Sequence, residues 1–256
     1  MKKPGLYCLL TALVYLGLTC HAFAGPKEIT VSAAMSLKNA FEEIGKLYES
    51  KTGTVCVLNF GASGDLLKQI SGGAPVDIFA SAAKKDMDEA DKKGLTIAGT
   101  RVNFAMNCVV LIVPANAKTD IESFEGLKAL EIKKIALGNP KSVPAGRYTE
   151  DVFTFYHIIL SIKDKFIYTE NVRQVLDYVA RNEVDAGVVF ATDAAVRSKE
   201  VKIVAAAPES SHKPVVYPIA LVKGTKNEAD AKSFIALVLS DEGRAVLRKY
   251  GFKTNQ

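Results

Sequence analysis

The feature that most constrains the fold is a strand-like run followed by small residues, a serine and a helical pattern. Glu28–Val31 is typical of a β-strand, Ser32–Leu37 follows it, and a helical pattern extends from there to about Ser50. A helix N-terminus presents N–H groups without partners and a partial positive charge, so such a junction suits an anion. Taken alone, Ser36 is better explained as an ordinary helix cap, a position where serine is favoured.

The same order of features occurs a second time, which favours the binding-site interpretation. Val55–Phe60 indicates a strand, Gly61–Gly64 a turn that contains Ser63, and a helical pattern starts at Asp65. We therefore expect Ser36 and Ser63 to form corners of one site, with Ser36 still capping its helix when no ligand is bound. Asp65 is expected to face solvent and complement the helix dipole; facing a ligand instead, it would accept a proton.

Further along, strands and helices alternate at a spacing that predicts an α/β fold with a mostly parallel sheet. The longest strand-like stretch, residues 102–114, would pass from one lobe to a second, and residues 215–222 would return. Helices are expected near residues 121–130 and from about 147 to 157. A chain of 256 residues allows one large domain or two such lobes.

The N-terminus has the features of a secretory signal peptide. Two lysines precede an apolar run, Leu6–Leu18, which is too short to span a membrane comfortably, and Ala22–Ala24 is an A-x-A cleavage motif. Cleavage is predicted after Ala24, so the protein is expected to be exported. A lipoprotein form that uses Cys20 fits poorly, because the residues before this cysteine depart from the small-residue pattern that lipidation needs.

Enzymatic and nucleic-acid functions are not indicated. The formal net charge is +5, and no basic block is dense enough to argue for nucleic acid. The sequence has no G-x-S-x-G elbow, no P-loop and no dinucleotide fingerprint. His157 and His212 lack neighbours at metal-ligand spacing, so structural roles are expected for both.

Two further groups of residues are not assigned to a binding site. They are the carboxylates of a polar helix, which have an ordinary explanation, and two cysteines, whose pairing is left open. A Lys-rich polar helix carries several carboxylates, which are expected to form a solvated face: Asp86, Asp88, Glu89 and Asp91. Cys56 and Cys108 remain after the signal peptide is removed. They would either pair in an oxidising compartment or stay as two separate buried thiols.

What recurs is a set of uncharged donors at predicted helix starts. They are the hydroxyls of Ser36 and Ser63 and the backbone N–H groups around Ala145 and Val172, with Pro144 stiffening the turn before Ala145. Such donors bind an ionised ligand at roughly 1.5–3 kcal/mol per charged hydrogen bond. A proton on the ligand would need an acceptor, so hydrogen phosphate is penalised. The set favours oxyanions that are dianions at neutral pH, such as sulfate, molybdate or tungstate.

These residues resemble the family of periplasmic molybdate-binding proteins of molybdate ABC transporters, which are type 2 periplasmic binding proteins. The resemblance covers nearly all of the chain after the signal peptide, and it rests on the order and spacing of short motifs. The motifs are Ala33–Leu37, Gly72–Asp77, Val143–Gly146, Arg181–Glu183, Gly187–Ala194, Ser211–Lys213, Tyr217–Pro218 and Tyr250–Phe252.

The resemblance implies two α/β lobes, each a mixed, mostly parallel sheet flanked by helices, with the ligand cleft between them. Residues 1–24 would be the signal peptide, 25–107 the first part of lobe 1, 108–214 lobe 2, and 215–256 the return to lobe 1.

The resemblance also implies a set of ligand contacts. Ser36 and Ser63 would each give hydroxyl and backbone donors, while Ala145 and Val172 would give backbone N–H groups. Phe190 stands where the family often has a tyrosine, so one hydroxyl donor is lost there. Molybdenum would be bound as the oxyanion through these same residues, without direct metal ligands and without a cofactor.

The implied function is that of a monomeric periplasmic receptor. It would close its lobes around molybdate, and also tungstate, and deliver the ion to the membrane permease of an ABC transporter, with no nucleic-acid partner. The alternatives are a receptor for sulfate or phosphate, a secreted enzyme with Ser36 or Ser63 as nucleophile, and the ligand-sensing half of a transcription regulator. The enzyme lacks a base in the sequence pattern, and the signal peptide argues against a regulator.

Overall fold

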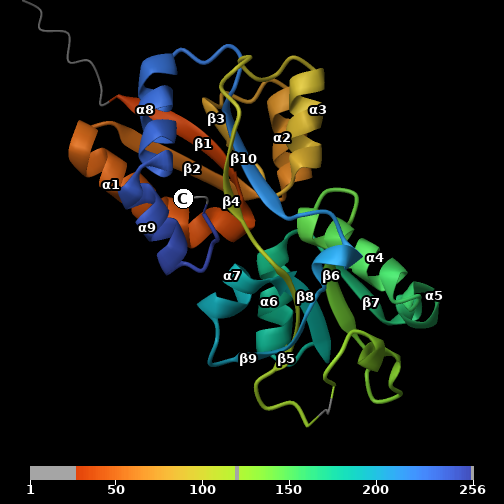
Figure 1. The fold of residues 1–256 in the computed structure, drawn as a ribbon. Coiled ribbons are helices and arrows are strands. Elements are labelled where there is room, and N and C mark those ends of the chain that lie inside the picture. Colours follow the sequence, from red (N-terminus) through yellow and green to blue (C-terminus); the bar gives the residue numbers. More distant parts are fainter. Residues whose placement is uncertain (1–26, 119–120, 255–256) are drawn as a thin grey trace, which may run out of the picture.

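The computed structural model describes residues 27–118 and 121–254. Within these residues the chain forms two five-stranded sheets, each flanked by helices, in two lobes joined by crossing segments (Figure 1). The predicted signal peptide and its cleavage site after Ala24 lie outside the described residues. The predicted α/β fold with two mixed sheets is confirmed.

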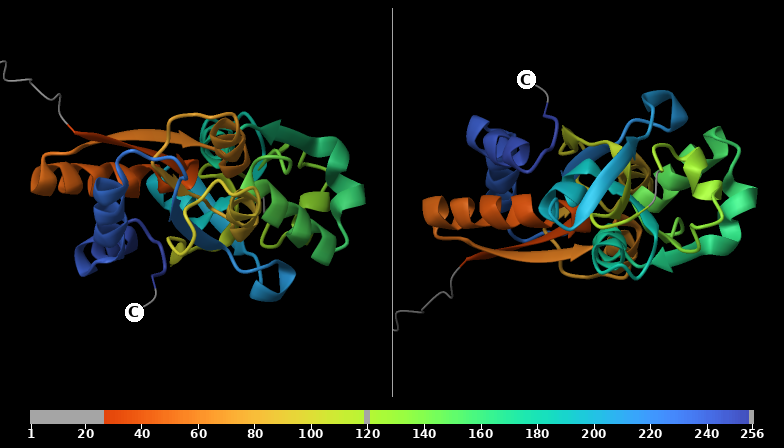
Figure 2. Two further views of the ribbon diagram at one scale, coloured as in Figure 1. Left: turned by 90° about the horizontal axis from the view of Figure 1, so that it is seen from above. Right: turned by 90° about the horizontal axis from the view of Figure 1, so that it is seen from below.

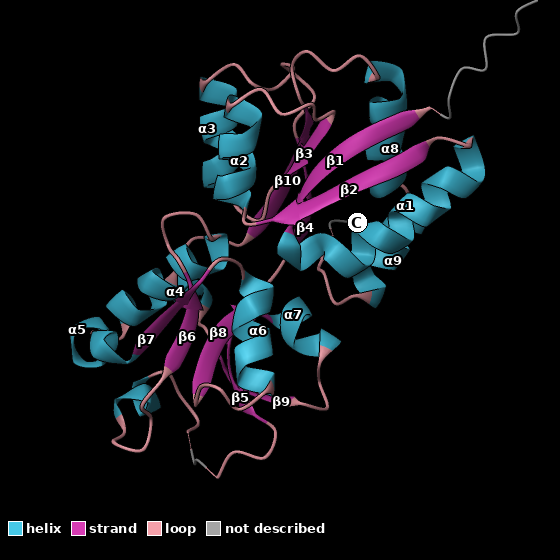
Figure 3. Cartoon of the chain, turned by 180° about the vertical axis from the view of Figure 1, so that it is seen from behind, coloured by secondary structure: helices cyan, strands magenta, loops and turns pink. Residues whose placement is uncertain are grey.

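The first lobe contains both ends of the described chain. Its strand order is β2-β1-β3-β10-β4, with β1 parallel to β2 and β3, and β10 antiparallel to β3 and β4. Figures 1 and 3 show α2 and α3 on one side of this sheet and α1, α8 and α9 on the other. The elements are β1 (Glu28–Ala34), η1 (Met35–Leu37), α1 (Lys38–Thr52), β2 (Val55–Gly61), α2 (Ser63–Ser71), β3 (Ile78–Ala80), α3 (Lys84–Lys92), β4 (Val102–Met106), β10 (Val216–Leu221), α8 (Glu228–Leu239) and α9 (Asp241–Lys249).

The second lobe is built from the middle of the chain. Its strand order is β7-β6-β8-β5-β9, with β6 parallel to β7 and β8, and β5 antiparallel to β8 and β9. The elements are β5 (Val109–Pro114), η2 (Glu125–Lys128), β6 (Ile135–Gly138), α4 (Pro144–Phe155), α5 (Ile159–Ile162), η3 (Lys163–Lys165), β7 (Phe166–Thr169), α6 (Val172–Ala180), β8 (Ala186–Phe190), α7 (Ala191–Val196), β9 (Val201–Ala206) and η4 (Glu209–Ser211).

The chain passes between the sheets twice, and the first passage corrects a prediction. The single strand expected over residues 102–114 is two strands, β4 and β5, which lie in different sheets. Asn107 makes the break: its N–H donates to the carbonyl of Val215 at 3.1 Å, and its side-chain oxygen accepts from the N–H of Cys108 at 2.9 Å. The return passage runs from β9 through η4 to β10.

A second correction concerns the helix expected near residues 121–130. Only a short 3₁₀ helix, η2, forms there. Ile121, Phe124 and Leu127 are all buried, and they recur every third residue. Only Leu127 lies within η2, and Ile121 and Phe124 are buried from the irregular segment before it, so these side chains reach the core without a longer α-helix.

The core of the first lobe is an aromatic cluster between its sheet and the helices that cover it. Phe41 on α1 contacts Phe104 on β4 and Phe234 on α8, with ring centroids 5.8 and 5.9 Å apart. Tyr48 adds an edge contact to Phe234. Figure 2 shows the C-terminal helices α8 and α9 lying against α1, so the two ends of the described chain stabilise one lobe.

The strand directions place several loops at the cleft between the lobes. β1, β2 and β3 are parallel, and so are β6, β7 and β8, so within each lobe their carboxyl ends meet at one edge of the sheet. In α/β sheets such edges are where ligands bind. The turns after these strands lead into η1 and α2 in the first lobe, and into α4, α6 and α7 in the second.

Candidate functional site

The turns from both lobes enclose a small pocket in the cleft. Its cavity volume is about 10 Å³, comparable to the space that one water molecule needs, so a large organic ligand does not fit. Ser36, Ser63, Ala145, Val172 and Phe190 all line it, so the structure brings together the residues singled out in the sequence. The full lining is Ala34, Met35, Ser36, Gly61, Ala62, Ser63, Ala82, Val143, Pro144, Ala145, Asn171, Val172 and Phe190.

The first lobe contributes two buried serine hydroxyls. Ser36 lies in η1 and Ser63 is the first residue of α2, and they are 5% and 0% exposed. The expectation that Ser36 caps its helix is wrong, because the cap residue of α1 is Leu37 and no side chain caps it. Ala62 precedes α2 in the same uncapped way. Both hydroxyls are therefore free of the role that serine usually has at a helix start.

The serine hydroxyls are held by different partners. Ser63 Oγ accepts the N–H of Ala82, from the turn after β3, at 3.0 Å. Ser36 Oγ lies 3.0 Å from the hydroxyl of Tyr217, on β10. Tyr217 is fully buried and its hydroxyl also accepts from Asn107 Nδ2 at 3.1 Å. Sequence reasoning missed Tyr217 and Asn107 as site residues, because each meets its partner from more than a hundred positions away.

The second lobe contributes backbone N–H groups at two helix starts. Pro144 occupies the first turn of α4, and the preceding Val143 is extended, so the N–H groups that follow have no intrahelical partner. At the start of α6 the side chain of Asn171 accepts from the N–H groups of Arg173 and Gln174 at 3.0 and 3.1 Å. This cap satisfies the second and third N–H groups and leaves that of Val172 at the pocket.

The pocket lining has no Asp, Glu, His, Lys or Arg side chain. Asp65, the nearest acidic candidate in sequence, is half-buried and pairs with the exposed Lys68 at 2.8 Å instead. The site therefore offers hydroxyl and N–H dipoles at helix starts, and no carboxylate that would accept a proton from a bound ligand. Phe190 closes the pocket with an apolar ring, in edge contact with Tyr148 and Tyr217 at 6.2 and 6.0 Å.

Three contacts join the lobes around this pocket. The N–H of Gly64 donates to the carbonyl of Ser142 at 2.9 Å, where any side chain at position 64 would clash with the Ser142 backbone. Arg147 on α4 pairs with Asp86 on α3. Each lobe therefore contacts the other beside the residues that line the pocket.

The pairing of Asp86 corrects the expectation that this carboxylate belongs to a solvated face. It is 4% exposed, whereas Asp88 and Asp91 of the same helix lie at the surface against Arg101. Burial raises the pKa of the Asp86 carboxyl, and the Arg147 guanidinium beside it opposes that rise. The partner lies on the other lobe, so nothing in the local sequence marks Asp86 as different from its neighbours.

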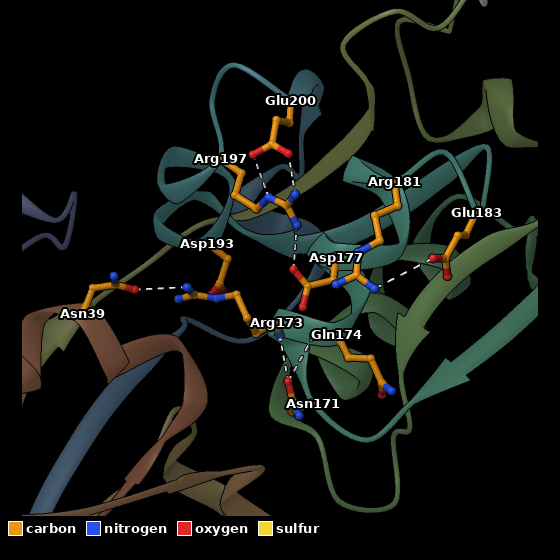
Figure 4. Close-up of polar contacts among 10 residues, drawn as sticks. All are labelled: Asn39, Asn171, Arg173, Gln174, Asp177, Arg181, Glu183, Asp193, Arg197 and Glu200. Atoms are coloured by element: carbon orange, nitrogen blue, oxygen red, sulfur yellow. Dashed lines mark hydrogen bonds and ion pairs between the residues drawn. The ribbon is translucent and has the colours of Figure 1, made fainter.

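The third contact is made by Arg173, directly after Val172. Its guanidinium donates to the side-chain oxygen of Asn39 on α1 at 3.0 Å and lies 3.3 Å from Asp193 Oδ1, as Figure 4 shows. Asp193 is fully buried, and burial raises the pKa of its carboxyl to about 6 although Arg173 opposes the shift. Its other oxygen has no hydrogen-bond partner among the described residues.

The histidines and cysteines lie away from the pocket lining. His157 is exposed beyond the end of α4, and His212 bonds through Nδ1 to the Lys213 carbonyl at 2.7 Å in a loop. Cys56 and Cys108 are half-buried free thiols. Burial raises the pKa of the Cys56 thiol to about 12.

Neither a membrane span nor a metal centre is found in residues 27–118 and 121–254. Their helices are too short or too polar to cross a bilayer. Over the same ranges no three His, Cys, Asp or Glu side chains gather closely enough to hold a metal ion.

Comparison with known proteins places the chain in a family. A family model described as a bacterial extracellular solute-binding protein matches residues 29–253. The putative ABC transporter substrate-binding lipoprotein YvgL of Bacillus subtilis is 46% identical over 231 residues, which cover 88% of this chain and 85% of that protein. The molybdate-binding protein ModA of Haemophilus influenzae is 40% identical over 256 residues, covering 98% of this chain and 99% of that protein.

A solved structure agrees with this placement. The substrate binding domain of a putative molybdenum ABC transporter from Clostridium difficile has a TM-score of 0.69 at 34% identity, covering 90% of this chain and 99% of that chain. The matches confirm the resemblance inferred from the motifs, and they agree with a protein that binds a solute rather than an enzyme. The chain belongs to the bacterial extracellular solute-binding protein family.

Proposed function

We propose that this protein captures molybdate, and also tungstate, outside the cytoplasm and delivers the ion to the permease of an ABC transporter. One observation carries the proposal: the pocket is lined by two serine hydroxyls and by helix N-termini, and by no charged side chain. Hydrogen bonds and dipoles alone would neutralise the bound ion. Ser36, Ser63, Ala145 and Val172 are the proposed contacts, with the Phe190 ring beside them.

The donor set selects for charge state. A dianion without protons accepts every hydrogen bond that such a pocket offers. Hydrogen phosphate brings one donor of its own, and an unpaired buried donor costs about 1–3 kcal/mol. Asp65, which would have accepted that proton, is turned to the surface. The proposal therefore places sulfate, molybdate and tungstate ahead of phosphate.

Size separates the remaining ions. The second lobe supplies backbone groups whose positions are set by α4 and α6, so they do not adjust to a smaller ion. Donors spaced for the longer metal–oxygen bonds of molybdate and tungstate hold sulfate poorly. The Haemophilus influenzae relative, named a molybdate-binding protein, matches nearly the full length of this chain and supports molybdate as the ligand.

Export and delivery complete the proposal. The predicted signal peptide would place the protein in the periplasm. We propose that it acts there as a monomer. Lobe closure buries the ion, because the ligand binds the closed state better than the open one. The contacts of Arg147 and Arg173 across the cleft belong to this closed state, which would dock on the permease.

Calorimetric titration of the chain without its signal peptide tests the proposal, using molybdate, tungstate, sulfate and phosphate. We expect tight binding of the first two, and thermal stabilisation of about 2.7 kcal/mol at a ligand concentration of 100 times Kd. Binding of sulfate or phosphate with no response to molybdate or tungstate would reassign the protein to those ions. Binding of none of the four would refute the proposal.

A further inference from the structure

We propose that Asn107 and Tyr217 are positioning residues that fix the Ser36 hydroxyl as a hydrogen-bond donor toward the pocket, and thereby help to exclude protonated oxyanions. The inference rests on the proposed function and names a specificity device within the same site. Neither residue lines the pocket. They act through Ser36, in a chain of hydrogen bonds whose direction is set at its far end.

The direction is set by the backbone of Cys108. Its N–H, which can only donate, lies 2.9 Å from the Asn107 side-chain oxygen, so the amide cannot be turned round without bringing two donors together. The amide nitrogen therefore faces the other way. It donates one hydrogen to Thr192 Oγ1 at 2.8 Å and the other to the Tyr217 hydroxyl at 3.1 Å.

In the second step, Tyr217 determines which hydroxyl donates in the hydrogen bond with Ser36. Tyr217 is fully buried, and its hydroxyl has two partners among the described residues, Asn107 and Ser36. Because it accepts from Asn107, its own hydrogen is satisfied only by donating to Ser36 Oγ. The reverse arrangement would leave a buried O–H unpaired. Burial raises the pKa of Tyr217 well above its usual value, so the hydroxyl keeps its proton.

The third step reaches the ligand. Ser36 Oγ accepts from Tyr217, so the serine hydrogen is left to point into the pocket. A ligand that carries a proton would donate it to the second lone pair of Ser36 Oγ, and the serine hydrogen would then have to turn away from the ligand. Because the Tyr217 hydroxyl already donates to Ser36, either the serine hydrogen or the tyrosine hydrogen is then left unpaired, and this energetic penalty falls on the protonated ion alone.

The chain of hydrogen bonds from Asn107 through Tyr217 to Ser36 is called the relay below. Ser63 shows why the relay is needed at only one serine. Its oxygen accepts from the backbone N–H of Ala82, which cannot reverse its role. Ser36 faces a tyrosine hydroxyl, a group that can either donate or accept. The direction at Ser36 therefore depends on Asn107, two hydrogen bonds away, and is open to change by substitution.

The test compares three variants by calorimetric titration with molybdate, and with phosphate as the protonated ion, including competition between the two. Tyr217→Phe removes the donor while keeping the ring contacts with Phe190 and Phe252. We expect molybdate affinity to fall by about threefold to tenfold, as for one weakened hydrogen bond. Phosphate affinity should fall less or rise, so the preference for molybdate over phosphate shrinks.

Asn107→Asp reverses the relay, because a carboxylate at that place accepts from the Tyr217 hydroxyl. Its added charge repels both dianions, so the readout is again the ratio of the two affinities, which should fall further than in Tyr217→Phe. Thr192→Val is the matched control. It removes the other partner of the Asn107 amide, leaves the relay intact, and should preserve the ratio. Thermal melting verifies that each variant is folded.

The outcomes separate the relay from the function. If Tyr217→Phe changes the affinities for molybdate and phosphate by the same factor, or changes neither, their ratio stays as in the wild type. This result overturns the relay, while molybdate binding by the wild type stands. If the wild type binds sulfate in place of molybdate, the proposed function fails and the sulfate-to-phosphate ratio judges the relay. A wild type that prefers phosphate, or binds none of these ions, overturns both.

Discussion

The two lobes face one pocket with different kinds of donor. Besides the backbone N–H groups expected at Ser36 and Ser63, the first lobe offers the side-chain hydroxyls of both serines, whose hydrogens rotate and must be directed by neighbouring groups. The second lobe offers backbone N–H groups at the starts of α4 and α6, whose directions are fixed by the helices. The first kind of donor is encoded by single residues, and the second by the position of whole elements.

This difference decides which substitutions can remove or displace the hydrogen-bond donors of each lobe. A serine is removed by one change of side chain. A backbone N–H at Ala145 or Val172 has no side chain to remove, so it is disturbed only by moving the helix that carries it. The second lobe should therefore tolerate many replacements at its lining residues and be sensitive at the positions where its helices touch the sheet.

The largest effect is expected from Gly146→Ala. A Cβ at this position would lie 1.9 Å from the carbonyl oxygen of Gly138 on β6, so α4 must move away from the sheet and take the N–H of Ala145 with it. Overpacking of this kind reduces the free energy of unfolding by about 1–3 kcal/mol. Loss of even one charged hydrogen bond lowers affinity by roughly ten- to a hundredfold, measured by calorimetric titration with molybdate.

Gly243→Ala provides the matched control for crowding. A Cβ there would lie 2.1 Å from the carbonyl oxygen of Leu237, between α8 and α9 of the first lobe, away from the pocket. It should lower the melting temperature without changing the affinity of the folded protein. If Gly146→Ala keeps wild-type affinity, the backbone of α4 is not part of the site and the contrast between the lobes is lost.

An intermediate effect is expected from Ser36→Ala and Ser63→Ala, measured separately. Each removes one hydroxyl donor and should weaken molybdate binding by about tenfold, or roughly 1.4 kcal/mol. Ser50→Ala, at an exposed serine at the end of α1 that donates to the carbonyl of Leu47, is the control and should bind as the wild type does. Wild-type affinity in both pocket variants would contradict the placement of the site.

The smallest effect is expected from Phe190→Tyr, which would give the second lobe a side-chain donor of its own. The new hydroxyl would replace the one that this position lacks relative to the resembled family. The gain should be about threefold in molybdate affinity, because burying the hydroxyl offsets much of the new hydrogen bond. Unchanged or weaker binding would mean that the para position of the ring, which would carry the hydroxyl, points away from the ion.

Local patterns allowed much of the site to be predicted. Ser36 and Ser63 stand in turns between a strand and a helix, and Ala145 and Val172 at helix starts, so each could be found within about ten residues of sequence. The two sheets follow from alternating strands and helices in the same way. The prediction of one long strand over residues 102–114 was wrong, because the chain turns at Asn107, whose N–H is hydrogen-bonded to the carbonyl of the distant Val215.

The remaining parts of the site depend on contacts between distant segments. Asp86 resembles the other carboxylates of α3 in sequence, and only the approach of Arg147 from the second lobe buries it. Tyr217 reaches Ser36 across 181 positions, because β10 returns to the first sheet after the second lobe is complete.

Local sequence therefore sufficed to predict which groups line the pocket: small turns, serines and helix starts without charge, since these are local consequences of residue type. The tertiary structure decided how those groups are directed and what surrounds them. It turned Asp65 outward, buried Asp86, and placed Asn107 and Tyr217 behind Ser36. Hydrogen-bond direction is a property of a whole chain of partners, and those partners meet only when both crossings between the lobes are made.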